Sequence, residues 1–299
     1  MGTQRRRWPI TAMAVLALAL FGAACGGDDD EGGGGGGGET AAEVEQHPEN
    51  TTMGRIQKKG EIVIGVKYDV PPFGFRNPQS GRVEGFDVDF GKAVAEALGV
   101  RTKLVEAISD NRIPFIQDGT VDLVLSTMTI NAERAAEIGF TDPYFIAHGR
   151  VLVPKDSSIR GVDDLAGKSV CTALGSTYEE TLKEQAPRAD LKLVDAYSEC
   201  LELLQNGAVD AISTDDVILT GMIIQDDSLK LVGDDLTVEP YGGGFKRGDT
   251  QFADFLNGVL QDYKSDGRWQ RSYDRWLGRF TGEKAQPPNQ TLDDVLKES

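Results

Sequence analysis

The sequence is poor in histidine and in basic residues. Its 299 residues include two histidines, His47 and His148, which argues against a metal site or a catalytic triad built on histidine. Lysine and arginine number 31 against 48 acidic residues, and a formal charge of −17 makes the chain a poor partner for nucleic acids and anionic membranes. Beyond the N-terminus no segment is apolar enough to span a membrane. We therefore expect no nucleic-acid partner, no metal and no cofactor.

The N-terminus carries the three parts of a secretory signal. Arg5–Arg7 supply positive charge, Ile10–Phe21 form an apolar run, and the small residues of "GAAC" lead to Cys25, so we predict a signal peptide over 1–24. Cys25 after small residues resembles a bacterial lipobox, which predicts lipidation of that cysteine. Simple cleavage near Ala24 is the alternative, because Gly22 stands where leucine is more usual.

Residues 25–50 are rich in glycine and acidic residues, which predicts a flexible tether with nothing to pack. Together with the lipidated cysteine, the tether predicts an extracytoplasmic lipoprotein, anchored to the outer face of the cell membrane. If Cys25 is lipidated, Cys171 and Cys200 remain as an even pair in an oxidising compartment. One disulfide is expected, with two buried free thiols as the alternative.

From residue 61 onward, β-branched strand patterns alternate with amphipathic helix patterns, which predicts an α/β architecture with largely parallel sheets. The predicted elements include strands at 62–68, 102–107, 169–174 and 209–214 and a helix at 86–99. The segments 105–127 and 194–215 also resemble each other: each has a strand, a serine, a helix, a Gln-Xaa-Gly turn and a Val-Asp strand. Because the helix–turn–strand arrangement is common, chance would explain so short a match between the two segments. We favour two similar lobes, each offering a polar loop at a strand's carboxyl end, where open α/β sheets bind ligands.

Two loops carry the residue types that a small zwitterion needs. In "STMTINAER", Thr127 and Thr129 offer hydroxyl groups, and Arg134 offers a planar fork suited to a carboxylate. In "LGSTYEETL", Thr177 lies just before a helix, and "STDDV" contributes Asp215 as a partner for a buried ammonium. Each feature also has an ordinary explanation as a helix cap or a solvated charge.

Two caps are expected at these loops. Asn131 precedes a short helix, so its side chain is expected to cap that helix. Ser176 followed by Glu179 matches the capping-box pattern, in which the serine side chain caps the helix and the glutamate returns to the backbone.

Five motifs occur together in this chain: "GFDVDFGKAVAEAL", "STMTINAER", "GFTDPYF", "LGST" and "STDDV". In this order, over about 60–280, they resemble the bacterial extracellular solute-binding proteins that serve polar amino-acid ABC importers. The resemblance implies a two-lobe type II periplasmic-binding fold, with two mainly parallel sheets flanked by helices and a two-strand hinge near 145–153 and 236–245. We expect the protein to be a monomer. It implies an ABC permease with its ATPase as partners. The expected divisions are lobe 1 over 51–147 and 242–281, lobe 2 over 148–241, and a C-terminal tail over 282–299.

The resemblance also implies roles for single residues. Arg134, Thr129 and Thr177 would hold the α-carboxylate of an amino acid, while Thr127 and Asp215 would hold its α-ammonium. "VKYD" and "SDNRIP" look like the corresponding segments of glutamate/aspartate-binding members. By that similarity Lys67, Ser109 and Arg112 would hold a side-chain carboxylate. The resemblance also places a disulfide between Cys171 and Cys200. Of Phe73 and Phe75 in "PPFGF", we expect one, taken as Phe73, beside the aliphatic part of the ligand and the other in the core.

The charges agree with an acidic ligand, because Lys67, Arg112 and Arg134 outnumber Asp215, and a cationic ligand would meet like charges in a desolvated cleft. Glutamine is harder to exclude than a cationic ligand, because its side-chain amide matches the cations of the pocket poorly but is not repelled by them. The leading expectation is a glutamate/aspartate-binding protein of an ABC importer that is not an enzyme and closes over its ligand. A cyclohexadienyl dehydratase on the same fold and a ligand sensor are the alternatives.

Overall fold

The computed structural model describes residues 44–278, 280, 282 and 284–298. The signal peptide, Cys25 and most of the tether fall outside the described residues, so these expectations stay predictions. Within the described part, no helix combines the length and the apolar character needed to cross a membrane.

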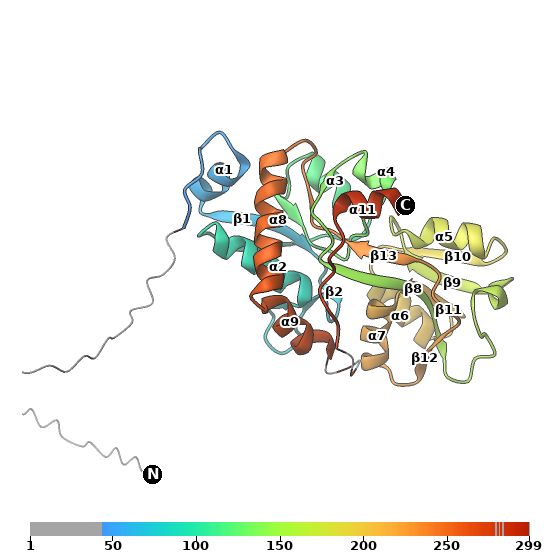
Figure 1. Cartoon of the computed structure of the whole chain (residues 1–299). Helices are drawn as coiled ribbons and strands as arrows, with labels where there is room; N and C mark the ends of the chain where they lie inside the picture. Colours follow the sequence, from blue (N-terminus) through green and yellow to red (C-terminus); the bar gives the residue numbers. More distant parts are fainter. Residues whose placement is uncertain (1–43, 279, 281, 283, 299) are drawn as a thin grey trace, which may run out of the picture. The chain divides into compact units, whose positions relative to one another are not determined.

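The first sheet, with the helices around it, forms the unit that we call lobe 1 (Figure 1). Its strands in spatial order are β5 (Arg101–Glu106), β1 (Glu61–Val66), β6 (Leu123–Val124), β14 (Gly244–Phe245) and β7 (Gly139–Phe140). Strand β1 is parallel to β5 and β6, whereas β14 runs antiparallel to β6 and β7. The strand near residue 244 thus returns to lobe 1 from a distant part of the chain.

Strand β1 has buried side chains on both faces of this sheet. Ile62 and Ile64 belong to the large core that includes α2 (Phe86–Ala97) and α8 (Thr250–Ser265). Val63, pointing to the opposite face, belongs to a smaller cluster with residues of α3 (Arg112–Gln117) and the C-terminal helix. Because side chains alternate along a strand, a continuous apolar run such as this one requires helices on both faces.

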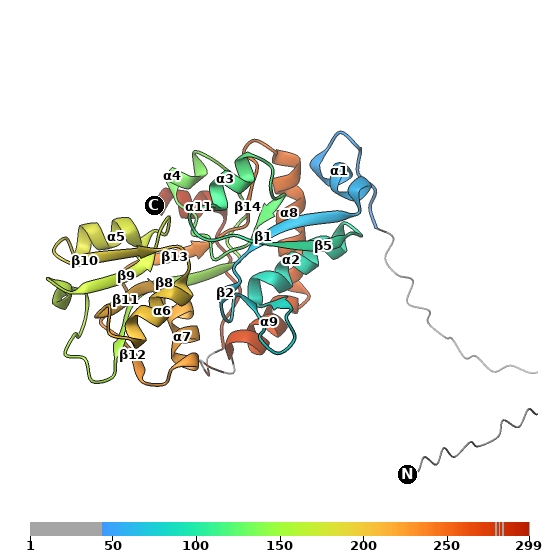
Figure 2. The same cartoon turned by 180° about the vertical axis from the view of Figure 1, so that it is seen from behind.

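The second sheet forms the unit that we call lobe 2 (Figure 2). Its strands in spatial order are β10 (Asp190–Val194), β9 (Ser169–Ala173), β11 (Ala211–Asp215), β8 (Phe145–Pro154) and β12 (Leu229–Val232). The clusters on its faces include residues of α6 (Tyr197–Gln205) and α7 (Asp216–Gln225) on one side, and of α5 (Tyr178–Gln185) on the other.

Two strands connect the lobes. The first half of β8 pairs antiparallel with β13 (Val238–Tyr241), with Phe145 opposite Tyr241 and His148 opposite Val238. Both strands lie where the two sheets meet (Figures 1 and 2). They coincide with the two crossings expected from the sequence, which confirms a two-lobe α/β fold with a two-strand hinge. The exact lobe boundaries stay a prediction.

Each of these two sheets is mainly parallel, as expected, with one strand that runs against the others, β14 in lobe 1 and β8 in lobe 2. In lobe 2, β9 is parallel to β10 and β11, but β8 is antiparallel to β11 and β12. The antiparallel members of both sheets flank the two chain crossings, whose direction fixes how the chain enters each sheet. Sequence alternation alone does not reveal that direction.

The remaining elements are short or peripheral. A small sheet packs beside lobe 1, consisting of β2 (Asp69–Val70), β3 (Gly74–Arg76) and β4 (Val83–Glu84). The other helical segments are α1 (Thr52–Lys59), α4 (Ala132–Ala135), the 3-10 turn Val162–Leu165, α9 (Arg268–Tyr273), the π-turn Asp274–Gly278 and α11 (Leu292–Glu298).

The C-terminal tail returns to lobe 1. Lys264 Nζ donates to the carbonyl oxygen of Pro288 at 2.8 Å, and the N–H of Leu292 donates to Asp142 at 2.7 Å. Val295 of α11 is buried in the cluster that contains Ile130. The tail is therefore packed against lobe 1 rather than projecting from it.

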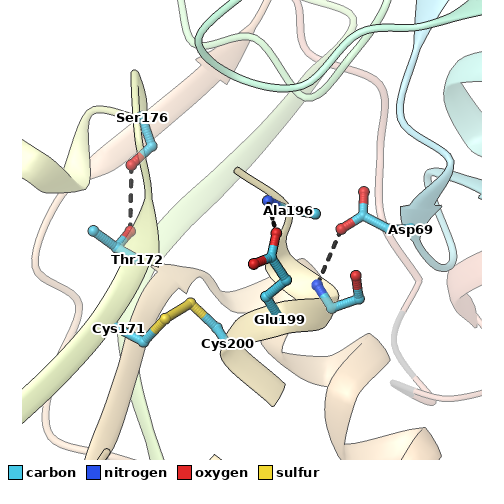
Figure 3. Close-up of a disulfide and its surroundings, with 8 residues drawn as sticks. Asp69, Cys171, Thr172, Ser176, Ala196, Glu199 and Cys200 are labelled. Carbon is cyan, nitrogen blue, oxygen red and sulfur yellow. Dashed lines mark hydrogen bonds between the residues drawn. A yellow bond between two sulfur atoms is a disulfide. The ribbon is translucent and has the colours of Figure 1, made fainter. Parts of the chain in front are cut away.

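Cys171 of β9 and Cys200 of α6 form a disulfide with a Cα–Cα distance of 5.5 Å, and both residues are fully buried (Figure 3). The bond ties a strand of lobe 2 to the helix that covers it. Near it, Asp69 of lobe 1 accepts a hydrogen bond of 3.0 Å from the backbone N–H of Ser198.

We expect the double variant Cys171→Ala/Cys200→Ala to lose about 3 kcal/mol of the free energy of unfolding, because the crosslink restricts the unfolded chain. The two cysteines are 29 residues apart in sequence, which sets the length of the closed loop. Equilibrium unfolding in urea, followed by circular dichroism, measures the difference. Wild-type protein treated with a reductant is the control and should unfold at the same urea concentration as the variant. Equal stability of the variant and the oxidised wild type would contradict this expectation.

Candidate functional site

A small cavity of about 10 Å³ lies between the two lobes, with room for roughly one water molecule. It is lined by Ser109, Arg112, Thr127, Thr129, Arg134, Ser176, Thr177, Tyr178, Tyr197 and Asp215. Seven of the nine ligand residues expected from the sequence are in this lining, drawn from both lobes. Beside the cavity lies a groove of about 1080 Å³ that is lined by residues of both lobes, among them Thr129, Arg134, Thr177 and Glu239. The lobes thus meet at the cavity and leave an open groove next to it.

The two other expected residues lie next to this lining or in the core. Lys67 is 1% exposed, and its Nζ donates to Ser109 Oγ at 2.8 Å. Phe73 is fully buried and packs edge-on against the rings of Phe86, Phe145 and Tyr241. It is not among the residues that line the cavity.

Thr127 adopts a backbone conformation that is rare for a β-branched residue, with φ of 44°. A carboxylate holds it there, since Asp87 accepts a hydrogen bond of 2.9 Å from the Thr127 N–H and another of 2.8 Å from the hydroxyl of Tyr144. Burial raises the pKa of Asp87 to about 7. The loop that presents the first-lobe hydroxyl groups is therefore fixed by a buried acid on α2.

Most of the side-chain N–H groups of Arg112 donate to backbone carbonyls. It donates to the carbonyl oxygens of Ser109, Ser126 and Thr127, at 3.0 to 3.1 Å, and to that of Gly175 at 3.3 Å. Burial and the nearby charge of Arg134 lower the pKa of Arg112 to about 9, so it stays charged at neutral pH. Arg112 thus braces the walls of the cavity.

Arg134 also donates to backbone carbonyls, but it makes two such hydrogen bonds where Arg112 makes four. Its two terminal nitrogens donate to the carbonyl oxygens of Thr129 at 2.9 Å and Gly175 at 3.1 Å. The side chain of Asn131 accepts from the N–H of Arg134 at 2.9 Å, which confirms the expected cap of α4. Burial lowers the pKa of Arg134, and the charge of Glu239 partly offsets this effect.

Gly175 is the point at which lobe 2 touches both arginines of lobe 1. Its φ of 72° lies in the left-handed region, and a Cβ atom there would come within 2.6 Å of the Cα of Asp110. Only glycine fits such an approach without strain. This position therefore lets the two lobes meet.

The expected capping box at α5 is wrong. The N-cap residue of α5 is Thr177, without a side-chain cap, and Ser176 contributes its carbonyl oxygen to the N–H of Glu179 at 3.4 Å. The Ser176 hydroxyl lies 3.3 Å from that of Thr172 (Figure 3). The helix begins one residue later than the motif predicts, which leaves the Thr177 side chain in the cavity wall.

Asp215 lies at the end of β11 and is bound by two tyrosines. Its carboxylate accepts from the hydroxyl of Tyr178 at 2.7 Å and from that of Tyr241 at 2.6 Å. Burial, together with the charge of Glu239, raises the pKa of Asp215 to about 8. No side-chain cap of α7 forms at this residue, so the alternative explanation of Asp215 as a helix cap fails.

Glu239 is a site residue that sequence reasoning missed. It lies on the hinge strand β13, is 2% exposed, and accepts hydrogen bonds at one oxygen from Thr129 at 2.5 Å and Thr177 at 3.1 Å. Its other oxygen accepts from Thr237 at 2.6 Å. The sequence feature that could have indicated Glu239 is its position in the middle of the strand segment "TVEPY", where apolar neighbours predict that a charged residue is buried.

Among the described residues, the charged side chains that are almost fully buried all surround this cavity. They are Lys67, Asp87, Arg112, Arg134, Asp215 and Glu239. Three cations thus face three carboxyl groups, where the sequence alone counted three cations and one. At neutral pH Asp215, with a pKa of about 8, is mostly protonated, and Lys67 and Asp87, with pKa values of about 7, are each partly charged, so the site stays net positive.

Two lobes joined by a pair of strands, with buried charges and hydroxyl groups between them, are typical of proteins that close over a small zwitterionic ligand. The chain belongs to the bacterial extracellular solute-binding proteins, family 3, which it matches over residues 62–279. It is an amino-acid-binding component of an ABC transporter and not an enzyme.

Two relatives and one solved structure illustrate the family. The chain is 38% identical to the ABC transporter glutamine-binding protein GlnH of Bacillus subtilis, covering 79% of this chain and 88% of that one. It is 33% identical to the glutamate-binding protein GluB of Corynebacterium efficiens, covering 77% and 81% respectively. An ancestral arginine-binding protein bound to glutamine is 36% identical with a TM-score of 0.70, covering 73% of this chain and 98% of that one.

Proposed function

We propose that the protein delivers a polar amino acid to its ABC permease and ATPase, and that it prefers glutamine to glutamate or aspartate. The observation that carries the preference is the side-chain end of the site, where Lys67 is buried against Ser109 and Arg112 already donates to four backbone carbonyls. A neutral side chain suits such a pocket, whereas glutamate brings a negative charge into a desolvated site with few free N–H groups. The preference differs from the acidic ligand expected from the sequence, because the sequence does not show that the N–H groups of Arg112 are already used.

The head-group roles remain those that the family resemblance implies. Arg134, Thr129 and Thr177 hold the α-carboxylate, and Thr127 and Asp215 hold the α-ammonium. The two lobes supply these groups together, so the full set is available only in the closed state. Their meeting at one small cavity supports the assignment.

The side-chain pocket supports a neutral amide better than a carboxylate. Burial and the charge of Arg112 lower the pKa of Lys67 to about 7, so this lysine is only partly charged at neutral pH. Arg112 already donates to four carbonyl oxygens and has little left for a bidentate contact. In this proposal Lys67, Ser109 and Arg112 hold the side-chain amide, and Phe73 supports the wall from the core.

Glutamate is the second candidate. Lys67 regains its charge if a carboxylate comes next to it, and the similarity to a glutamate-binding protein at 33% identity favours the same idea. The similarity to a glutamine-binding protein at 38% identity favours the first candidate.

Isothermal titration at pH 7 with glutamine, glutamate, aspartate and arginine tests the proposal, after bound ligand is removed by unfolding and refolding. We expect glutamine to bind most tightly and arginine most weakly of the four, since arginine brings a cation next to Lys67 and Arg112. Tighter binding of glutamate than of glutamine would overturn the preference but not the transport role. No binding of any amino acid would contradict the proposal as a whole.

The same titrations between pH 6 and pH 8 separate the two candidates further. The pKa values of Lys67 and Asp87 are both about 7, so raising the pH makes the pocket more negative. We expect the affinity for glutamate to fall relative to that for glutamine. The ionisation of Asp215 affects both ligands alike through their α-ammonium groups and cancels in the ratio. A ratio that stays constant would show that Lys67 lies outside the pocket.

Replacing Arg134 by alanine is expected to weaken binding of every amino acid by about a hundredfold or more, because a charge-assisted contact to the shared α-carboxylate is lost. Isothermal titration with glutamine and glutamate measures the loss. Arg268→Ala is the matched control, since this arginine pairs with Glu96 and Asp266 on the surface of lobe 1. Affinity within threefold of wild type would refute the role given to Arg134.

The proposal includes a monomeric protein held at the outer face of the cell membrane by lipid on Cys25, which rests on the sequence alone. The variant Cys25→Ser is expected to leave the membrane fraction of expressing cells, because serine offers no thiol for the lipid. Fractionation and immunoblotting measure the distribution. The variant Cys171→Ala should stay with the membrane as the control, and retention of Cys25→Ser there would contradict the anchor.

A further inference from the structure

Glu239 contacts the same hydroxyl groups that the proposed function gives to the ligand. A single carboxylate oxygen accepts from Thr129 of lobe 1 and from Thr177 of lobe 2. Thr237, two residues earlier in the chain, binds the other oxygen and so orients the side chain. Glu239 is 2% exposed and belongs to the lining of the groove between the lobes.

The third α-carboxylate group of the proposed site, Arg134, also interacts with Glu239. The negative charge of Glu239 favours the protonated guanidinium of Arg134 more strongly than any other neighbouring charge does. Two threonine hydroxyls thus donate to a carboxylate that belongs to the protein itself, and the charge of Arg134 interacts with it. This is the set of partners proposed for the α-carboxylate of an amino acid.

We propose that Glu239 is an internal competitor of the ligand: in the absence of amino acid its carboxylate takes the hydrogen bonds of the α-carboxylate and holds the two lobes together. The inference rests on the proposed function, and in particular on the head-group roles of Thr129, Thr177 and Arg134. It makes Glu239 a positioning residue that sets affinity without reacting or binding the ligand.

The competition follows from the number of hydrogen bonds that the two threonine hydroxyls can donate. A threonine hydroxyl donates a single hydrogen bond, so Thr129 and Thr177 cannot serve both carboxylates at once. An arriving α-carboxylate must therefore displace Glu239 while its charge is repelled by the charge of Glu239. Both effects weaken binding relative to a site in which residue 239 is neutral.

A simple brace for the hinge is the competing explanation, since Glu239 lies on β13 and binds Thr237 of the same segment. A brace predicts that any substitution loosens the hinge and weakens ligand binding. An internal competitor predicts the opposite sign for binding, because the ligand gains the partners that Glu239 gives up.

The experiment is Glu239→Gln, which keeps the shape, removes the charge and leaves an amide oxygen that holds Thr129 and Thr177 more weakly than a carboxylate does. Isothermal titration with glutamine and glutamate should give dissociation constants about tenfold lower than wild type, with the larger gain for glutamate. Hydrogen exchange of the ligand-free variant should be faster in the cleft segments 127–131 and 175–178, and ligand should restore protection. Glu239→Asp, which withdraws the carboxylate by one methylene, should shift both readouts in the same direction and covers the case in which the glutamine variant fails to fold.

Glu133→Gln is the matched control. Glu133 is exposed, lies next to Arg134 and lines the same groove as Glu239, and the substitution changes the net charge equally. We expect it to leave the dissociation constants within twofold of wild type. An equal gain in Glu133→Gln would reduce the effect to the general charge of the groove and overturn the inference.

The outcomes separate the inference from the function on which it rests. If wild type binds an amino acid and Glu239→Gln binds it equally or more weakly, Glu239 is not a competitor, and the proposed function stands. If wild type binds none of the amino acids, the function itself fails. Faster exchange in the cleft together with tighter binding is the result that supports the competitor.

Discussion

Burying six charged side chains between two sheets is the constraint on which the rest of this structure depends. A buried charge is strongly destabilising unless it is paired and hydrogen-bonded. Each of these groups has hydrogen-bond partners. Tyrosine hydroxyls donate to Asp87 and Asp215, and threonine hydroxyls donate to Glu239. Lys67 donates to the hydroxyl of Ser109, and Arg112 and Arg134 donate to backbone carbonyls. The large apolar cores on both sides supply the stability that allows such a site to exist.

The hinge connects this polar site to the core. Strand β13 places Glu239 in the cleft, while Tyr241, two residues further on, packs against Phe73 and Phe145 and donates its hydroxyl to Asp215. A relative movement of the lobes therefore has to rearrange hydrogen bonds at the site together with the aromatic contacts beside it. Coupling of this kind is what a binding protein needs if occupancy of the site is to be read from the arrangement of its lobes.

Much of the fold could be predicted because apolar periodicity is local. The helix at 86–97 and the strands β1, β5, β9 and β11 lie where the patterns predict them, and the two crossings occur at the expected segments. The direction of β14 could not be predicted, since it depends on how the chain returns from lobe 2. Phe73 shows a similar limit: the sequence indicates an aromatic residue near the site, but three neighbouring rings place its side chain in the core.

The sequence by itself determined the fold class, the family, the pairing of Cys171 with Cys200, and seven residues that line one cavity, because motif order and local patterns carry that information. Only the tertiary structure decided which charged groups share the site. Glu239 meets Thr129 across 110 residues of sequence, and Asp87 meets Thr127 across 40. Which charged groups share a buried space depends on the folded path of the whole chain. The complete set of these groups, rather than any single motif, bears on whether a neutral or an acidic ligand is preferred.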